Sequence, residues 1–157
     1  MEIPTKLIGF LNQSKVRYQL IHHPEAFTAQ ELAAIEHVKG KNHAKVVMVK
    51  TDDGRQLMAV LPADHRVDLA KLDALTGQRA TLATEAEFKS LFPDCAIGTM
   101  PPFGSLYNVP TYVDKSLTDE EFIVFEAGTH SDAIKMSYAD YVRLAKPQVS
   151  EFAAKSR

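Results

Sequence analysis

Apolar positions recur along the chain at two different spacings, which predict helices in some stretches and strands in others. Ile8 and Leu11 stand at helical spacing and predict a short amphipathic helix. The valine-rich run 45–51 is instead typical of a buried strand. By this reasoning we expect helices at Thr5–Ser14, Thr28–Gly40, Val67–Leu75, Thr84–Leu91 and Ser137–Ala145, and strands at Arg17–His22, Lys45–Thr51, Gln56–Leu61, Thr111–Val113, Phe122–Phe125 and Ala133–Met136.

Polar residues, glycine and proline mark the ends of these elements. Thr28 and Thr84 each precede a glutamate three residues later, the capping-box pattern that begins a helix. Asp53-Gly54 is a strong signal for a tight turn joining two antiparallel strands. Pro93 and Pro147 end the helices before them, because proline disfavours a helical conformation of the preceding residue.

The order of elements mixes hairpin-linked strands with scattered helices and lacks a regular strand–helix alternation. This order predicts an α+β fold with a mixed, mainly antiparallel sheet and surrounding helices. A chain of 157 residues without internal repeats or a long linker fits one domain, so we expect residues 1–157 to form a single unit.

Composition and charge limit the kinds of molecule that this protein is expected to bind and the compartment in which it works. A hydrophobic fraction of 45% and a charged fraction of 24% are ordinary for a soluble globular protein. The net charge of -2 argues against a general nucleic-acid coat protein but leaves room for a local basic groove. The single Cys95 excludes an internal disulfide and fits a reducing cytosol. The N-terminal apolar run 7–11 is too short for a signal peptide or a membrane span, so we expect a cytoplasmic protein with no membrane partner.

A loop rich in proline and glycine, residues 98–104, has a conformation that its sequence nearly dictates. Pro101 and Pro102 fix φ and provide no amide N–H, whereas the flanking glycines accept angles closed to other residues. The amides of Gly98, Thr99 and Met100 are then available to hold a carbonyl or an oxyanion. The same loop is equally well explained as a tight connection, and both interpretations stay open.

Two side chains are candidates for chemistry. Lys45 opens an apolar strand at the end of a basic segment, where its ammonium can project into a cleft and reach a phosphate or an ester carbonyl. A solvated lysine is the alternative. His130 follows a strand in a glycine-containing turn, a position that often carries catalytic groups, although a solvated histidine also fits there.

Several classes of site are disfavoured. His22 and His23 are adjacent, so on a strand they point to opposite faces and cannot share a metal ion. The chain has no paired metal-ligand spacing, no nucleophile elbow and no phosphate-binding glycine loop, so we expect neither a metal nor a cofactor. Cys95 as a nucleophile with His130 as its base is a third hypothesis, beside the interpretation of Cys95 as a buried structural thiol.

Taken together, the segments from His23 to Pro147 resemble the YbaK/EbsC family of aminoacyl-tRNA deacylases, which is related to the editing domain of bacterial prolyl-tRNA synthetases. The order and spacing of several short motifs carry the resemblance, and no single motif is decisive. These motifs are Ala44–Val47, Met58–Ala63, Val67–Leu72, Gly98–Phe103 and Ala127–His130.

The resemblance implies a trans-editing hydrolase that cleaves the ester of a tRNA mischarged with a small amino acid such as Ala, Cys, Ser or Thr, including tRNA for proline, without a cofactor. A catalytically inactive module that binds the tRNA end is the alternative. The expected partner is the 3′ acceptor end of mischarged tRNA and not DNA; whether a synthetase delivers it stays open. A ribose hydroxyl is implied to orient the attacking water, so His130 is not assigned as an obligatory base.

The family motifs also give candidate site residues in this chain. Six are expected to be catalytic, through the lysine, the backbone of the loop and the histidine: Lys45, Gly98, Thr99, Met100, Pro102 and His130. Four are expected to line the substrate pocket: Thr28, Met100, Pro101 and Phe103.

Overall fold

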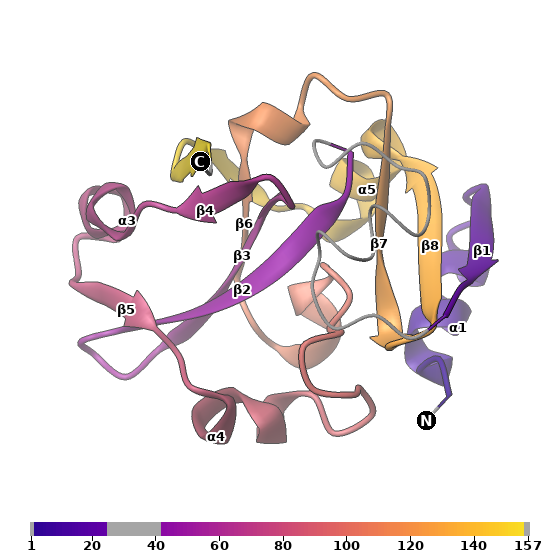
Figure 1. Cartoon of the computed structure of the whole chain (residues 1–157), viewed down its shortest axis with the longest axis horizontal. Coiled ribbons are helices and arrows are strands. Elements are labelled where there is room, and N and C mark those ends of the chain that lie inside the picture. The colour runs from indigo at the N-terminus through magenta and orange to yellow at the C-terminus, as the bar shows by residue number, and fades with distance from the viewer. Residues whose placement is uncertain (1, 25–41, 156–157) are drawn as a thin grey trace.

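Two β-sheets and a short strand pair, with helices packed around them, form the computed structural model, which describes residues 2–24 and 42–155 (Figure 1). The α-helices are α1 (Thr5–Gln13), α3 (Leu69–Thr76), α4 (Glu85–Phe88) and α5 (Tyr138–Ala145), with short 3₁₀ helices at Lys89–Leu91, Gly104–Tyr107 and Lys115–Leu117. The longer strands are β1 (Tyr18–His22), β2 (Ala44–Thr51), β3 (Gln56–Pro62), β6 (Thr111–Asp114), β7 (Phe122–Thr129) and β8 (Asp132–Ser137). Four strands are only three residues long: β4 (His65–Val67), β5 (Ala80–Leu82), β9 (Gln148–Ser150) and β10 (Ala153–Lys155).

Antiparallel pairing predominates among these strands. The larger sheet has the order β5-β2-β3-β6-β9, in which β3–β6 and β6–β9 are parallel and the other pairs antiparallel. The second sheet, β1-β8-β7, is antiparallel throughout, as is the strand pair β10-β4. The predicted α+β class with mainly antiparallel pairing is confirmed, although the strands are divided among three sheets.

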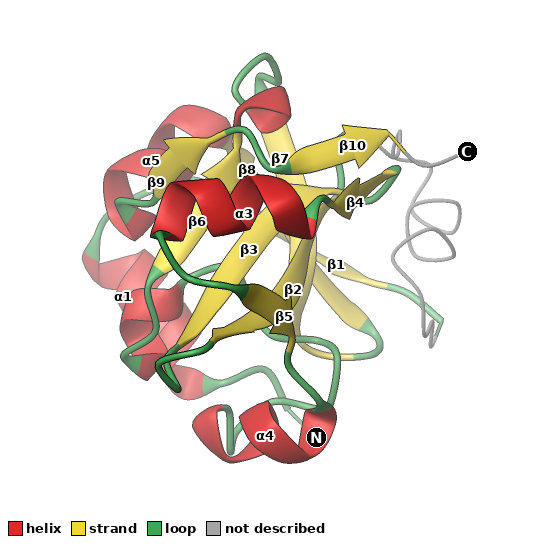
Figure 2. Ribbon diagram, turned by 90° about the vertical axis from the view of Figure 1, so that its left-hand side faces the viewer, coloured by secondary structure: helices red, strands yellow, loops and turns green. Residues whose placement is uncertain are grey.

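The β2–β3 hairpin separates two hydrophobic clusters, because alternate residues of a strand face opposite sides of the sheet. One face packs against α1, α5 and the second sheet, and the other packs against α3, which lies across the larger sheet in Figure 2. The hairpin residues of the first cluster are Ala44, Met48, Met58 and Val60; those of the second are Val49, Leu57, Ala59 and Leu61.

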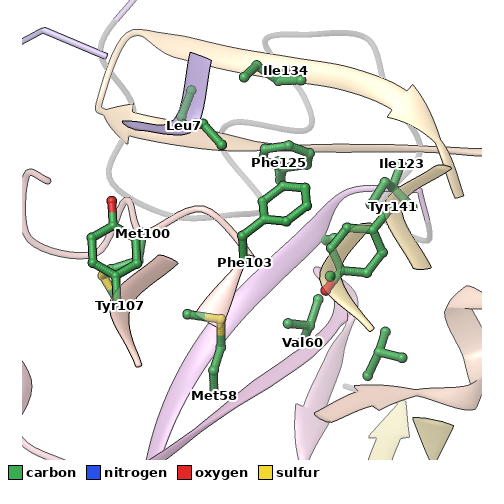
Figure 3. Close-up of a cluster of buried hydrophobic side chains, with 14 of the residues drawn as sticks. Leu7, Met58, Val60, Met100, Phe103, Tyr107, Ile123, Phe125, Ile134 and Tyr141 are labelled. Atoms are coloured by element: carbon green, nitrogen blue, oxygen red, sulfur yellow. The ribbon is translucent and has the colours of Figure 1, made fainter. Parts of the chain in front are cut away.

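An aromatic group forms the centre of the first cluster. Phe103 is fully buried, and its ring makes edge-on contacts with Phe10, Phe125 and Tyr141, with centroid separations of 5.8, 5.6 and 5.3 Å. Figure 3 shows Phe125 and Tyr141 beside it. The Tyr141 hydroxyl donates to the Pro102 carbonyl at 2.8 Å. The proline loop is therefore fixed to the core from its C-terminal side.

The predicted elements differ from the structure mainly at their ends. The helix expected from Val67 begins at Leu69, because the Asp68 side chain accepts hydrogen bonds from the first amides of the helix and Val67 belongs to β4. The strand expected at 122–125 continues to Thr129. The four short strands were not predicted, because three residues show too little periodicity. The helix expected at 28–40 lies outside the described residues.

No helix within the described ranges is long and apolar enough to cross a membrane.

Candidate active site

A cavity of about 170 Å³ lies where β2 and β7 diverge. The two strands meet at a parallel bridge between His43 and Val124, and the Val124 amide donates to the Asn42 carbonyl at 3.0 Å. Beyond this bridge β2 runs away from β7 at an angle, as Figure 1 shows. The cavity is lined by His43, Ala44, Lys45, Val46, Gly98, Met100 and Glu126.

Lys45 lines this cavity from β2, as expected from its place at the start of an apolar strand. It is half-buried, and its Nζ donates to the Ala63 carbonyl at 3.5 Å. Burial lowers the pKa of Lys45, and the nearby Asp64 carboxylate opposes this shift. The ammonium has lost part of its hydration and has a long contact to the protein, so an anionic or carbonyl oxygen in the cavity would be a favourable partner.

His43 lines the same cavity, although no motif in the sequence marked it as a candidate site residue. Its side chain is fully buried, and burial together with the nearby His23 lowers its pKa to about 4. The imidazole is therefore neutral at neutral pH. It adds no positive charge beside Lys45.

Gly98 and Met100 of the proline loop also line the cavity. Gly98 has φ 83°, which only glycine adopts without strain. Among the described residues, no acceptor is found for the Gly98 or Met100 amide. The Thr99 amide, expected to be available as well, donates to the Ala96 carbonyl at 3.1 Å, and the Thr99 hydroxyl donates to the same oxygen at 2.6 Å. The prediction of three available amides is therefore wrong for Thr99, because closing the turn uses that amide.

A bulge in β7 holds the loop in place. Glu126 pairs with Ala133 and Thr129 with Asp132, so Ala127 and Gly128 have no partners in β8. Gly128, with φ 88°, faces the loop: its carbonyl accepts from the Ala96 amide at 2.9 Å, and its amide donates to the Thr99 carbonyl at 2.9 Å. These two hydrogen bonds connect the turn around Gly98 to the second sheet.

Three other predicted loop residues lie outside the cavity lining. Pro101 and Pro102 are buried, and the Pro101 carbonyl accepts from the Phe103 amide at 2.8 Å. Phe103 packs in the aromatic core, so its ring serves the fold and does not form the expected pocket wall. Met100 lies between the two environments, because it is buried in the core and also lines the cavity.

His130 lies in the turn between β7 and β8 and is half-buried. It is not among the described residues that line the cavity. Next to it, the Thr129 hydroxyl donates to Asp132 at 2.6 Å, which stabilises the turn. Thr28, the remaining predicted pocket residue, lies outside the described residues.

Glu126 is the second cavity residue that sequence reasoning missed. It is half-buried in β7, whose other residues are mostly buried and apolar. The sequence did contain a signal for Glu126, namely an acidic residue within a mostly apolar strand. An acid is rarely placed there without a partner or a role.

Cys95 is buried, and its Sγ lies 3.4 Å from the Tyr107 hydroxyl. Burial raises the pKa of this thiol to about 11. A reactive cysteine needs a thiolate near neutral pH, so this environment favours the structural interpretation over the nucleophile. In the part of the chain that the structure describes, no three potential metal-ligating side chains gather around one point.

Known proteins resemble the chain over nearly its whole length. A model of the aminoacyl-tRNA editing domain family matches residues 23–144. The multifunctional Ser/Thr-tRNA deacylase ProXp-y of Escherichia coli (strain K12) is 28% identical over 152 residues, covering 94% of this chain and 90% of that protein. The prolyl-tRNA editing protein ProX of Acetoanaerobium sticklandii is 24% identical over 160 residues, covering 98% and 97%.

Two solved structures have the same fold. The hypothetical protein APE2540 has a TM-score of 0.87 at 21% identity, with 95% of this chain and 99% of that chain covered. A candidate trans-editing enzyme for prolyl tRNA synthetase has a TM-score of 0.83 at 22% identity, with 95% of each chain covered.

Proposed function

The chain belongs to the aminoacyl-tRNA editing domain family, and we propose that it is a deacylase that hydrolyses the ester of tRNA mischarged with a small amino acid. One observation carries this proposal: a small cavity is lined both by a half-buried lysine and by a glycine loop with two available amides. The relatives named as a Ser/Thr-tRNA deacylase and a prolyl-tRNA editing protein support the same class of reaction.

The size of the cavity favours a small aminoacyl group. Its volume of about 170 Å³ is similar to that of an engineered cavity of roughly 150 Å³ that holds one benzene molecule. Met100 narrows the space from the loop side. A second site that accepts small residues suits editing, because one methylene changes binding by only about 1–3 kcal/mol and a synthetase cannot reject such residues by affinity alone.

Hydrolysis requires stabilisation of the negative charge that forms when water adds to the ester carbonyl. We assign this role to the amides of Gly98 and Met100, which the turn and the bulge at Gly128 hold rigid. Lys45 binds the ester oxygen or the terminal phosphate and so holds the ester within reach of water. Collapse of the intermediate breaks the bond to the ribose oxygen, releases the free amino acid and restores the 3′ hydroxyl. Pro101 and Pro102 act through the backbone, by keeping the loop in this shape.

The substrate partner in this proposal is the 3′ end of a mischarged tRNA in the cytoplasm, and residues 1–157 act as one editing domain. Delivery of the tRNA by an aminoacyl-tRNA synthetase is a further part of the proposal. Co-purification of the chain with a synthetase, in the presence and absence of tRNA, tests that part.

A panel of mischarged tRNAs tests the function itself. We expect ester loss well above the spontaneous rate for tRNA carrying Ala, Cys, Ser or Thr, and a much slower rate for a large residue such as Phe, because its ring alone would fill a space of about 170 Å³ that must also hold the ester and the amino group. The rate is followed by acid-precipitable labelled amino acid. Binding of tRNA without accelerated ester loss would refute the proposed deacylase activity and favour the alternative, a catalytically inactive module that binds the tRNA end.

Cys95→Ala separates this mechanism from thiol catalysis. Because burial raises the pKa of the thiol to about 11, we expect the variant to deacylate at the wild-type rate within about twofold. A modest loss of stability, about 1 kcal/mol, is expected from the lost packing. The deacylation assay and a thermal melt measure both; a rate reduced 100-fold in a folded variant would restore the cysteine hypothesis.

A further inference from the structure

Glu126 and Lys45 occupy matching positions on the two strands that border the cavity. Each stands two residues beyond the parallel bridge between His43 and Val124. Since side chains alternate along a strand, both lie on the face that carries the bridged pair. On β7 the neighbouring Phe125 points to the opposite face, into the aromatic core, which agrees with this assignment.

The cavity therefore has one cationic and one anionic side chain on strands that diverge from a common point. His43 adds no charge between them, because its pKa of about 4 keeps it neutral. An aminoacyl ester has the complementary polarity: a carbonyl and phosphate oxygens at one end, and an α-amino group at the other. Opposite charges at two fixed points define which way round such a molecule sits.

We propose that Glu126 binds the α-amino group of the aminoacyl moiety and so orients the substrate in this site, an inference that rests on the proposed deacylase function. The α-amino group donates hydrogen bonds in both its protonated and its neutral state, and a carboxylate accepts from either. With the amino group held by β7, the ester carbonyl is directed toward the amides of Gly98 and Met100 and toward Lys45. An N-blocked aminoacyl group cannot make this contact, and its blocking group would overlap the side of the cavity formed by β7.

Binding of two stable probes tests the proposal without relying on turnover. The probes are acceptor-stem minihelices carrying alanine through a 3′ amide, one with a free amino group and one N-acetylated. Calorimetry compares wild type, Glu126→Gln, Glu126→Asp and the control Glu121→Gln, an exposed acid just before the same strand. Thermal melts establish that each variant is folded.

We expect wild type and Glu121→Gln to bind the free-amine probe about 10- to 100-fold more tightly than the acetylated probe, the range for one hydrogen bond to a charged group. Glu126→Gln is expected to bind both probes with nearly equal affinity, and Glu126→Asp to restore part of the preference. Equal binding by wild type, or a preference retained in Glu126→Gln, overturns the inference.

A parallel hydrolysis assay with alanyl-tRNA distinguishes the two proposals. A wild-type preference for the free amine that Glu126→Gln loses supports the role of Glu126, even if no ester is cleaved. Absent cleavage would then contradict the proposed deacylase alone. Cleavage with an unchanged preference in Glu126→Gln would contradict the role of Glu126 alone.

Discussion

Replacing Lys45 with alanine is expected to lower the deacylation rate by about 100- to 1000-fold while leaving the protein folded. The loss is of the size seen when one preorganised donor is removed from a developing oxyanion. Lys45 lines the cavity, and among the described residues its ammonium makes one long hydrogen bond, 3.5 Å, to the Ala63 carbonyl. Its ammonium therefore contributes to substrate binding more than to the fold.

The expected stability of this variant follows from the electrostatics. Burial lowers the pKa of Lys45, so the folded state holds its charged form less favourably than water does. Removing the charge relieves that cost, and the loss of packing by the aliphatic stem opposes the gain. We expect a change within about 1 kcal/mol in the free energy of unfolding.

Single-turnover deacylation and a urea unfolding curve measure the two effects. Lys50→Ala is the matched control, because Lys50 belongs to the same strand but pairs with Glu87 at 2.7 Å, away from the cavity lining. Lys45→Met keeps the stem and removes the charge, and it should be as slow as Lys45→Ala. A wild-type rate in either Lys45 variant would remove the lysine from the mechanism.

Gly128→Ala is expected to damage both stability and activity, because this glycine joins the fold to the loop. Its φ of 88° is unfavourable for alanine, and an added Cβ would lie 2.5 Å from a ring carbon of Pro4. The left-handed backbone costs about 1–2 kcal/mol and the overlap about 1–3 kcal/mol. For a chain of this size the sum corresponds to a fall of roughly 10 °C in Tm.

We expect the deacylation rate of Gly128→Ala to fall even where the variant is fully folded. The Gly128 amide and carbonyl hold the Thr99 carbonyl and the Ala96 amide, so a shift of the bulge moves the amides of Gly98 and Met100. A displacement of about 1 Å in a reacting geometry can cost on the order of 100-fold in rate. The rate is measured well below the Tm of the variant, where the protein remains folded.

Gly54→Ala provides the control for backbone strain. Gly54 has a similar φ of 85°, but a Cβ there meets nothing within 4 Å. We expect the strained backbone of Gly54→Ala to lower the free energy of unfolding by about 1–2 kcal/mol and to leave the deacylation rate unchanged. Equal losses of activity in both variants would show that the link between the bulge and the loop has no catalytic importance.

Local signals predicted the elements that depend on neighbours in the chain. The capping box at Thr84 and the caps at Ser137 and Gly77 are present, and Asp53-Gly54 turns the hairpin as expected. Such signals act over a few residues, so a single sequence is enough to detect them. Short strands such as β5 and β9 escaped detection because long-range pairing, not local pattern, makes them strands.

The site was predicted in part for the same reason. Lys45, Gly98 and Met100 stood out by residue type and context, and all three line one cavity. His43 and Glu126 did not stand out, because their proximity depends on the bridge between β2 and β7, two segments far apart in the chain. The direction of the Phe103 ring was likewise not decidable from its position after two prolines.

The sequence by itself therefore determined the α+β class, the family resemblance, the stiffness of the proline loop and the importance of Lys45 as a candidate. These follow from periodicity, capping and backbone restriction, which are properties of short segments. Only the tertiary structure decided that the Thr99 amide closes a turn, that Phe103 belongs to the core, and that Glu126 borders the cavity. The last two depend on which distant segments pack together, and that choice is made by the whole hydrophobic core, whereas the turn at Thr99 closes within four residues and Gly128 of β7 only holds it in place.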